Sequence, residues 1–191
     1  MLRPVKARLM VFARWRARRA SKALIEQLRG EIVAAARRPA LYETLGAPDR
    51  IDGRFELLTL HVGLVLRRLV AIGGLGDDIA QDLVNDVFLH FDDTLRELAL
   101  NDVAVSKRLK TMKAAFYGRN AAYAAALDSG SRPDLEAALA RNVYGARDGA
   151  PLAGVLADYV ASVNGALAEM SLEDFATGRF RFPEGRIASG G

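Results

Sequence analysis

The sequence predicts an all-α protein, a single-domain and irregular bundle of about six to seven helices. Apolar residues recur every three to four positions through most of the chain, and no stretch alternates as a half-buried strand does for more than a few residues. Glycine and proline breaks separate the helical stretches. A chain of 191 residues with 51% hydrophobic residues is long enough to bury one core. We expect a basic leader at 1–20, a helical domain at 21–186 and a disordered tail at 187–191.

The first half of the chain predicts two long helices around a short one. Residues 21–38 place apolar side chains on one face, and Pro39 ends that helix because the residue before a proline leaves the helical region. Residues 40–46 predict a short helical turn. Asp52 is the expected N-cap of a helix over 53–72, which is apolar nearly all round and is therefore expected at the centre of the bundle.

The next helix has the clearest division between apolar and polar faces. Gly73 to Gly76 break the chain, and Asp77 or Asp78 is expected to cap a helix that runs to about residue 98. Its apolar face carries Leu83, Val87, Phe88, Phe91, Leu95 and Leu98. Its polar face carries Asp82, Asp86, His90, Asp93 and Glu97.

The second half of the chain predicts three further helical segments. One covers about 103–127, and the next begins around Ser131, with proline in its first turn, and stops at Gly145. A third covers 148–170. Residues 171–174 have the form of a capping box, and residues 180–183 read as extended chain.

Charge is divided unevenly along the chain. Residues 1–40 hold 11 Lys and Arg against two acids, whereas residues 41–191 hold 16 against 21. The net charge of +4 therefore describes a basic leader on an acidic body, and this argues against a nucleic-acid partner for the body.

The basic leader has three interpretations. It is a solvated tail, a helix on an anionic membrane surface, or a cleaved presequence. The candidate membrane-surface residues are Arg14, Trp15, Arg16, Arg18 and Arg19. The longest uncharged apolar run covers only residues 57–66, which is too short for a membrane span of about 20 residues.

The sequence offers little catalytic chemistry, so we expect a protein that is not an enzyme and that holds no cofactor and no metal. The chain has no cysteine and only two histidines. His61 lies in the apolar helix and is expected to be a hydrogen-bonded core histidine. His90 lies one turn from Asp86, where a metal site is conceivable, but a solvated acidic face explains the same residues.

A basic helix with interleaved aromatic residues is the candidate binding element. Its cations are Lys107, Arg108, Lys110, Lys113 and Arg119, with Phe116 and Tyr117 among them. Such a helix can bind phosphate or an acidic peptide segment. The alternative is a solvated face whose aromatic residues point inward.

Several separated segments occur together in the order seen in one known family. They are residues 37–49 (RRPALYETLGAPD), 52–56 (DGRFE), 60–62 (LHV), 66–69 (LRRL), 105–110 (VSKRLK), 115–119 (AFYGR) and 137–144. Over residues 21 to 183 the chain resembles the ubiquinol–cytochrome c chaperone family. The resemblance implies an all-helical chaperone that binds newly made cytochrome b and promotes assembly of the cytochrome bc complex (complex III).

The resemblance also implies partners, a location and candidate residues. A small partner chaperone and an anionic membrane are expected contacts. The short leader favours a bacterial protein, cytoplasmic and peripheral on the inner membrane, over one on the matrix side of the mitochondrial inner membrane. The candidate client-binding residues are Lys107, Arg108, Lys110, Lys113, Tyr117, Arg119, Arg54, Arg67 and Arg68.

Two other functions remain open from the sequence. One is an RNA- or ribosome-associated binding module that uses the basic N-terminal segment. The other is a metal-dependent enzyme centred on Asp86 and His90.

Overall fold

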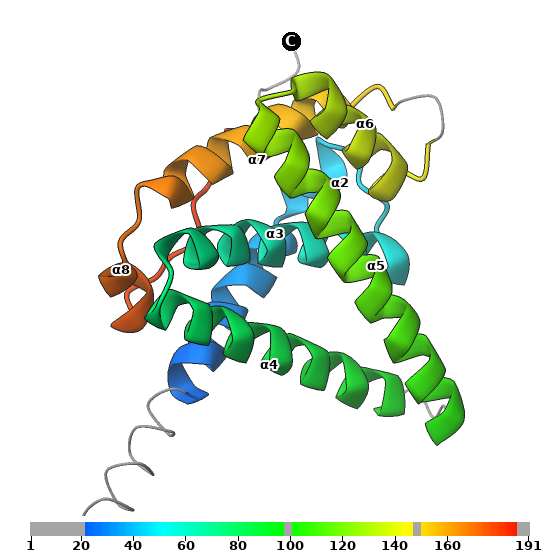
Figure 1. The fold of residues 1–191 in the computed structure, drawn as a ribbon. Helices are drawn as coiled ribbons and strands as arrows, with labels where there is room; N and C mark the ends of the chain where they lie inside the picture. The colour runs from blue at the N-terminus through cyan, green and yellow to red at the C-terminus, as the bar shows by residue number, and fades with distance from the viewer. Residues whose placement is uncertain (1–21, 98–100, 147–149, 187–191) are drawn as a thin grey trace, which may run out of the picture.

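The chain folds as a single bundle of helices, which confirms the predicted fold class (Figure 1). The computed structural model describes residues 22–97, 101–146 and 150–186, and no strand occurs among them. A helix at 22–36 is followed by α2 (Pro39–Glu43), α3 (Ile51–Ile72), α4 (Leu75–Glu97), α5 (Asp102–Ser129), α6 (Arg132–Asn142), α7 (Ala153–Ala168) and α8 (Leu172–Ala176).

Helix α3 lies at the centre of the bundle, as its continuous apolar character predicts. It packs against α4, α5 and α7 (Figure 1). Its buried side chains include Leu57, Leu60, Val65 and Leu69, which are fully shielded from solvent. Their burial against three different helices makes α3 the main contributor to one continuous core.

A glycine sets the distance between α3 and α5. A Cβ atom on Gly63 would lie 1.8 Å from the side-chain oxygen of Asn120 on α5. A Cβ atom there would force the Asn120 side chain to move, so glycine lets this side chain pack directly against the α3 backbone.

Three predicted helix starts are wrong by a few residues. The N-cap of α3 is Arg50, and Asp52 lies in the first turn, where its charge still favours the helix dipole. Helix α4 begins at Leu75, because backbone bonds from Gly76 to Gly73 (2.9 Å) and from Asp77 to Gly74 (3.0 Å) have already turned the chain. Asp77 and Asp78 are therefore first-turn residues. Helix α7 begins at Ala153, after the proline at 151, and not at 148.

Other local predictions are confirmed. The hydroxyl of Ser131 accepts a bond from the backbone N–H of Asp134 at 3.3 Å, which caps α6. Ser171 and Asp174 form the capping box of α8, with the Ser171 N–H donating to the Asp174 carboxylate at 2.7 Å. Residues 179–186 carry no regular helix, in agreement with the expected extended segment.

This C-terminal segment closes over the core. The Arg38 guanidinium donates to the carbonyls of Phe182 (3.2 Å) and Pro183 (3.1 Å). The Phe182 ring is buried with its centroid 5.1 Å from the His61 ring. Phe175 of α8 stacks on Phe180 at 5.1 Å. The segment thus ties residues far apart in the sequence to the central helix.

His61 is a core histidine, as predicted. Its Nδ1 lies 2.7 Å from the Leu57 carbonyl oxygen and its Nε2 lies 2.8 Å from the Tyr159 hydroxyl. The side chain is completely buried. Burial disfavours the imidazolium and lowers the pKa of His61 from 6.5 to about 4.

The His61 environment makes stability depend on pH. Between pH 6.5 and about 4, the unfolded chain binds a proton at His61 that the folded chain excludes. The free energy of unfolding should therefore fall with decreasing pH, and His61 should contribute about 3 kcal/mol of that loss. We expect His61→Gln to unfold with a weaker pH dependence than the wild type, measured by urea denaturation at pH 7.0, 5.5 and 4.5.

The matched control is His90→Gln, because it removes the other imidazole, which is exposed. It should keep the wild-type dependence. Identical pH dependence in the wild type and His61→Gln would contradict this account of His61.

Candidate functional site

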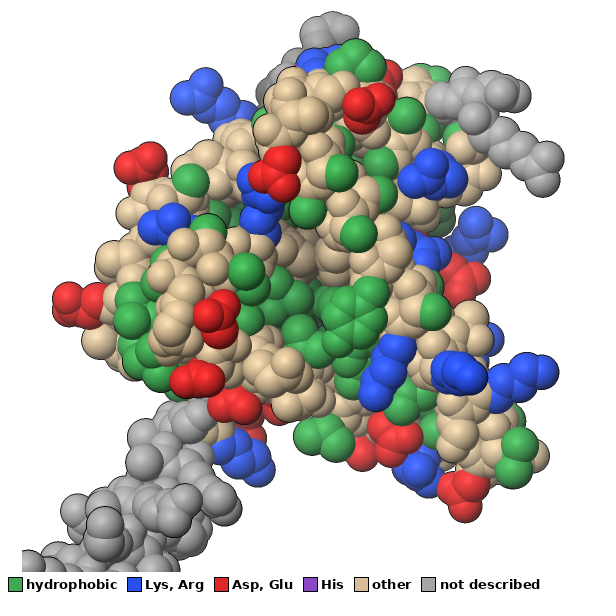
Figure 2. All heavy atoms as spheres, viewed as in Figure 1, with side chains coloured by type: hydrophobic (Ala, Val, Ile, Leu, Met, Phe, Trp, Pro, Cys, Tyr) green, Lys and Arg blue, Asp and Glu red, His purple; other side chains and the backbone are tan. Residues whose placement is uncertain are grey.

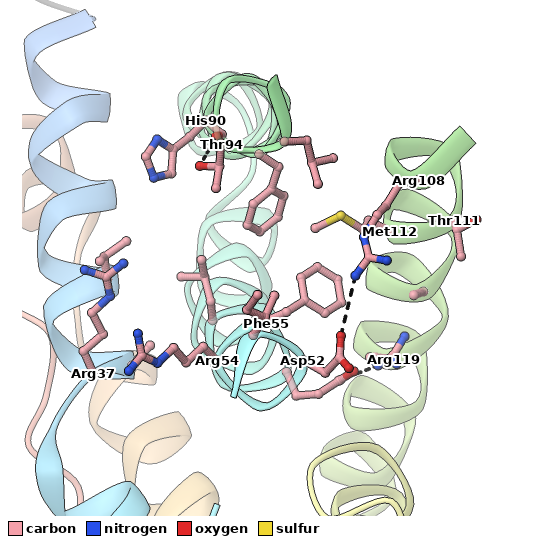
Figure 3. A pocket seen from close by; sticks show the side chains of 18 of the residues that line it. Arg37, Asp52, Arg54, Phe55, His90, Thr94, Arg108, Thr111, Met112 and Arg119 are labelled. Atoms are coloured by element: carbon pink, nitrogen blue, oxygen red, sulfur yellow. Dashed lines mark hydrogen bonds and ion pairs between the residues drawn. The ribbon is translucent and has the colours of Figure 1, made fainter. Parts of the chain in front are cut away.

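A groove opens between the helix at 22–36, α3, α4 and α5 (Figure 3). Its volume is about 780 Å³, which lies within the range of ligand-binding clefts. The apolar part of its lining comes from all four helices: Val33, Ala36, Ile51, Phe55, Leu58, Phe91, Leu95, Ala104, Met112 and Ala115. Ile51 is 70% exposed, so the apolar surface continues out to the mouth of the groove.

The sequence of α5 explains why this space is left open. The groove-facing positions of α5 include Ala104 and Ala115, which are too short to reach across to α3 and α4. Among the described residues of this 28-residue helix, only Val105, Phe116, Tyr123 and Ala126 are buried. Small residues on the groove side therefore leave a gap that the surrounding helices do not fill.

Cations surround the apolar lining on more than one side. Arg37 and Arg54 lie on the side of the helix at 22–36, and Arg108 and Arg119 lie on the side formed by α5 (Figure 3). Lys107 of α5 also lines the groove. The two lining carboxylates already have partners. Asp52 lies 3.8 Å from Arg108, and Glu56 pairs with Arg119. Arg54 pairs with Asp49 outside the groove at 2.7 Å.

Two of these cations stand apart from the ion pairs. Within the described parts of the chain, Arg37 and Lys107 form no ion pair. The groove therefore presents an excess of positive charge around an apolar surface. Such a lining favours a ligand that is apolar in the middle and negatively charged at its edges.

The Glu56–Arg119 pair lies at the inner end of the groove. The Glu56 side chain is almost fully buried, and the guanidinium of Arg119 also lies 5.8 Å from the centroid of the Phe55 ring. Burial raises the pKa of Glu56, and the positive charge of Arg119 opposes that rise. Arg119 thus has a structural task, since it neutralises a carboxylate that water cannot reach.

The other predicted residues of α5 lie away from the groove. Tyr117 is 56% exposed and its ring lies 6.4 Å from that of Phe88, while the Lys113 ammonium lies 5.2 Å from the Phe88 centroid. Figure 2 shows apolar side chains gathered in a hollow among α3, α4 and α5, with lysine or arginine beside it. At 100° per residue, Lys113 and Lys107 point in directions about 120° apart. The predicted basic stripe therefore divides between two faces of α5.

Arg67 and Arg68 brace the fold. Arg67 donates to Asp128 of α5 at 2.6 Å and to Asn164 of α7 at 3.2 Å. Arg68 donates to the Met170 carbonyl at 2.8 Å, just before α8. Both side chains are half-buried and leave α3 toward other helices. They lie outside the groove.

The polar face of α4 is partly used for packing. Asp86 lies 2.6 Å from Arg29 in a half-buried ion pair. His90 lies on the mouth of the groove, one turn from Thr94 (Figure 3). Among the described residues there is no group of three or more His, Asp or Glu side chains placed to hold a metal ion.

The predicted membrane-surface residues Arg14, Trp15, Arg16, Arg18 and Arg19 lie outside the described residues, as does the tail at 187–191. Among the helices that the structure describes, none has the length and apolar character needed to cross a membrane.

Sequence reasoning found part of the groove and missed the rest. It selected Arg54, Lys107, Arg108 and Arg119. It did not select Arg37, the aromatic pair Phe55 and Phe91 (centroids 5.5 Å apart), or the other apolar lining residues. In the sequence, each of these residues has the pattern of an ordinary core or surface residue of its own helix. The groove exists only because four helices bring them together.

The protein is a bundle of helices with an apolar groove that is edged with positive charge. Comparison with known families gives a match to the ubiquinol–cytochrome c chaperone model over residues 43–182. The chain belongs to the ubiquinol–cytochrome c chaperone family, as its sequence motifs predict.

A solved structure supports this assignment. The chain is similar to the Cbp3 homolog from Brucella abortus, with 36% sequence identity and a TM-score of 0.81. The match covers 92% of this chain and 96% of the Brucella chain. The comparison with curated proteins gives no match.

The buried ion pair predicts that two arginine substitutions on α5 lower the free energy of unfolding by different amounts. Arg119→Ala should lower the free energy of unfolding by about 3 kcal/mol, because it leaves the buried Glu56 carboxylate without a partner. Arg108→Ala is the matched control. It removes an exposed guanidinium 3.8 Å from an exposed carboxylate and should cost less than about 1 kcal/mol. Urea denaturation of the two variants and the wild type measures both values, and equal losses would contradict a structural task for Arg119.

Proposed function

We propose that this protein is an assembly chaperone that binds newly made cytochrome b and promotes assembly of the cytochrome bc complex. The observation that carries the proposal is membership of the ubiquinol–cytochrome c chaperone family over most of the helical domain. The groove supports it, since a chaperone must offer a surface to an incompletely assembled client.

The chemistry of the groove suits a client of this kind. A membrane protein that has not yet found its partners exposes apolar segments to water. The groove offers an apolar lining about as long as four helical turns, with cations at its edges. Covering the exposed segment there removes apolar surface from water on both molecules.

The proposal places the protein beside the membrane that holds the complex. The described residues contribute the binding domain, and the basic segment at 1–20 would add attraction to an anionic surface of up to about 1 kcal/mol per cation. We propose a peripheral position on the cytoplasmic side of a bacterial inner membrane, with a small partner chaperone as a further contact.

Deletion of the gene tests the proposed function directly. Without the protein, membranes should contain little assembled cytochrome bc complex, seen as loss of b-type haem absorbance and of ubiquinol–cytochrome c reductase activity. A plasmid copy should restore both, and cytochrome b should crosslink to the tagged protein. Normal levels of the complex in the deletion strain would contradict the proposal.

Charge reversal separates the two faces of α5. Lys107→Glu should weaken crosslinking to cytochrome b and lower the amount of assembled complex, because it adds negative charge to the groove. Lys113→Glu makes the same charge change on the face beside Phe88. If only Lys113→Glu weakens crosslinking to cytochrome b, the client binds at the face beside Phe88 and not in the groove. If the triple reversal of Lys107, Lys110 and Lys113 leaves crosslinking and assembly unchanged, these basic residues of α5 do not bind the client.

A further inference from the structure

We propose that the groove binds a single apolar α-helical segment of about four turns that carries carboxylate side chains on both flanks of its apolar face. The inference deepens the proposed function, because it states which chemistry of client the groove accepts. The groove can be tested for this chemistry without cytochrome b.

The length of the groove matches a short helix. Residues from Ala104 to Arg119 of α5 line it, which at 1.5 Å per residue corresponds to about 22 Å along the helix axis. A ligand lying alongside α5 over that distance has room for about 15 helical residues. A small rounded ligand would leave most of this length uncovered.

The shape of the lining suits side chains that project from one face of a helix. Phe55 of α3 and Phe91 of α4 pack together in the lining, with ring centroids 5.5 Å apart. Met112 of α5 projects into the groove from the α5 side (Figure 3). A helix that enters a groove presents apolar anchors at positions i, i+3 or i+4, and i+7. Ala104, Thr111 and Ala115 give the wall of α5 short side chains between its longer ones, which leaves space for such anchors.

The positions of the cations select against a lipid headgroup. A headgroup carries its negative charge at one point and needs its cations gathered there. Here Arg37 and Arg54 lie on one side of the groove and Arg108 lies on the other (Figure 3). Lys107 belongs to the same helix as Arg108 and also lines the groove. The lining carboxylates Asp52 and Glu56 are already paired, so the excess charge is positive. A helix that lies along α5 with carboxylates on both flanks of its apolar face places negative charge close to each side.

A synthetic peptide tests the inference with the intact chain. The probe is a fluorescein-labelled helix of about 16 residues with leucines on one face and glutamates on both flanks of that face. A matched peptide has lysines in place of the glutamates. Fluorescence anisotropy should show binding of the glutamate peptide at least about tenfold tighter than that of the lysine peptide. Equal binding of the two would overturn the charge assignment.

Variants locate the binding site. Ala115→Trp puts a large ring into the groove and should weaken binding of the glutamate peptide about tenfold. Arg37→Glu with Lys107→Glu should weaken it to a similar extent and should reverse the preference toward the lysine peptide. Because both charge changes are at the protein surface, this reversal remains informative even where Ala115→Trp perturbs folding, which circular dichroism would reveal.

Lys110→Glu is the matched control, since it makes the same charge change on the same helix outside the groove. It should leave the affinity within about twofold, and an equal loss would mean that binding follows general charge and not the groove. Phosphatidylglycerol vesicles provide the competing occupant. If the vesicles bind the protein, Ala115→Trp abolishes that binding and the peptide does not bind, then the groove holds a lipid and the inference is wrong.

The two proposals fail differently. If the deletion strain lacks the cytochrome bc complex but the peptide does not bind, the helix inference is wrong and the assembly function stands. If the peptide binds in the groove but the deletion strain assembles the complex normally, the groove has the inferred chemistry and serves another client.

Discussion

The structure depends on how the polar side chains of α3 are satisfied. This helix is buried among α4, α5 and α7, yet it carries Glu56, His61, Arg67 and Arg68. A buried polar group without a partner costs several kcal/mol, so each of these needs a partner from another element. Glu56 forms an ion pair with Arg119 on α5, and His61 forms a hydrogen bond with the Tyr159 hydroxyl on α7. Arg67 and Arg68 reach α5, α7 and the chain before α8.

These contacts account for the position of α5 and for the groove beside it. The second half of α5 is held against α3 by the Arg119 pair and by the close approach of Asn120 to Gly63. The first half of α5 lines the groove, and its short side chains Ala104, Thr111 and Ala115 alternate with longer ones. The groove therefore lies beside the half of α5 that precedes these contacts with α3.

The basic residues of α5 have different surroundings on different faces of the helix. Arg119 faces inward and neutralises Glu56, whereas Lys107 stands at the groove edge, where an incoming ligand would meet it. Lys113 covers the Phe88 ring on a different face. The same helix therefore contributes both to the packing of the bundle and to the lining of the groove.

The sequence by itself determined the all-α class, the central place of α3 and the local caps at Ser131 and Ser171, because these depend on helical periodicity and on neighbours three or four residues away. Its motifs also indicated the family that the comparison confirms. It missed the starts of α3, α4 and α7, since backbone bonds outside the expected caps begin those helices. Only the tertiary structure decided that His61 meets Tyr159, that Arg119 serves Glu56, and that residues from four helices converge on one groove. Those contacts join positions up to 98 residues apart, and side-chain spacing along a single helix carries no information about them.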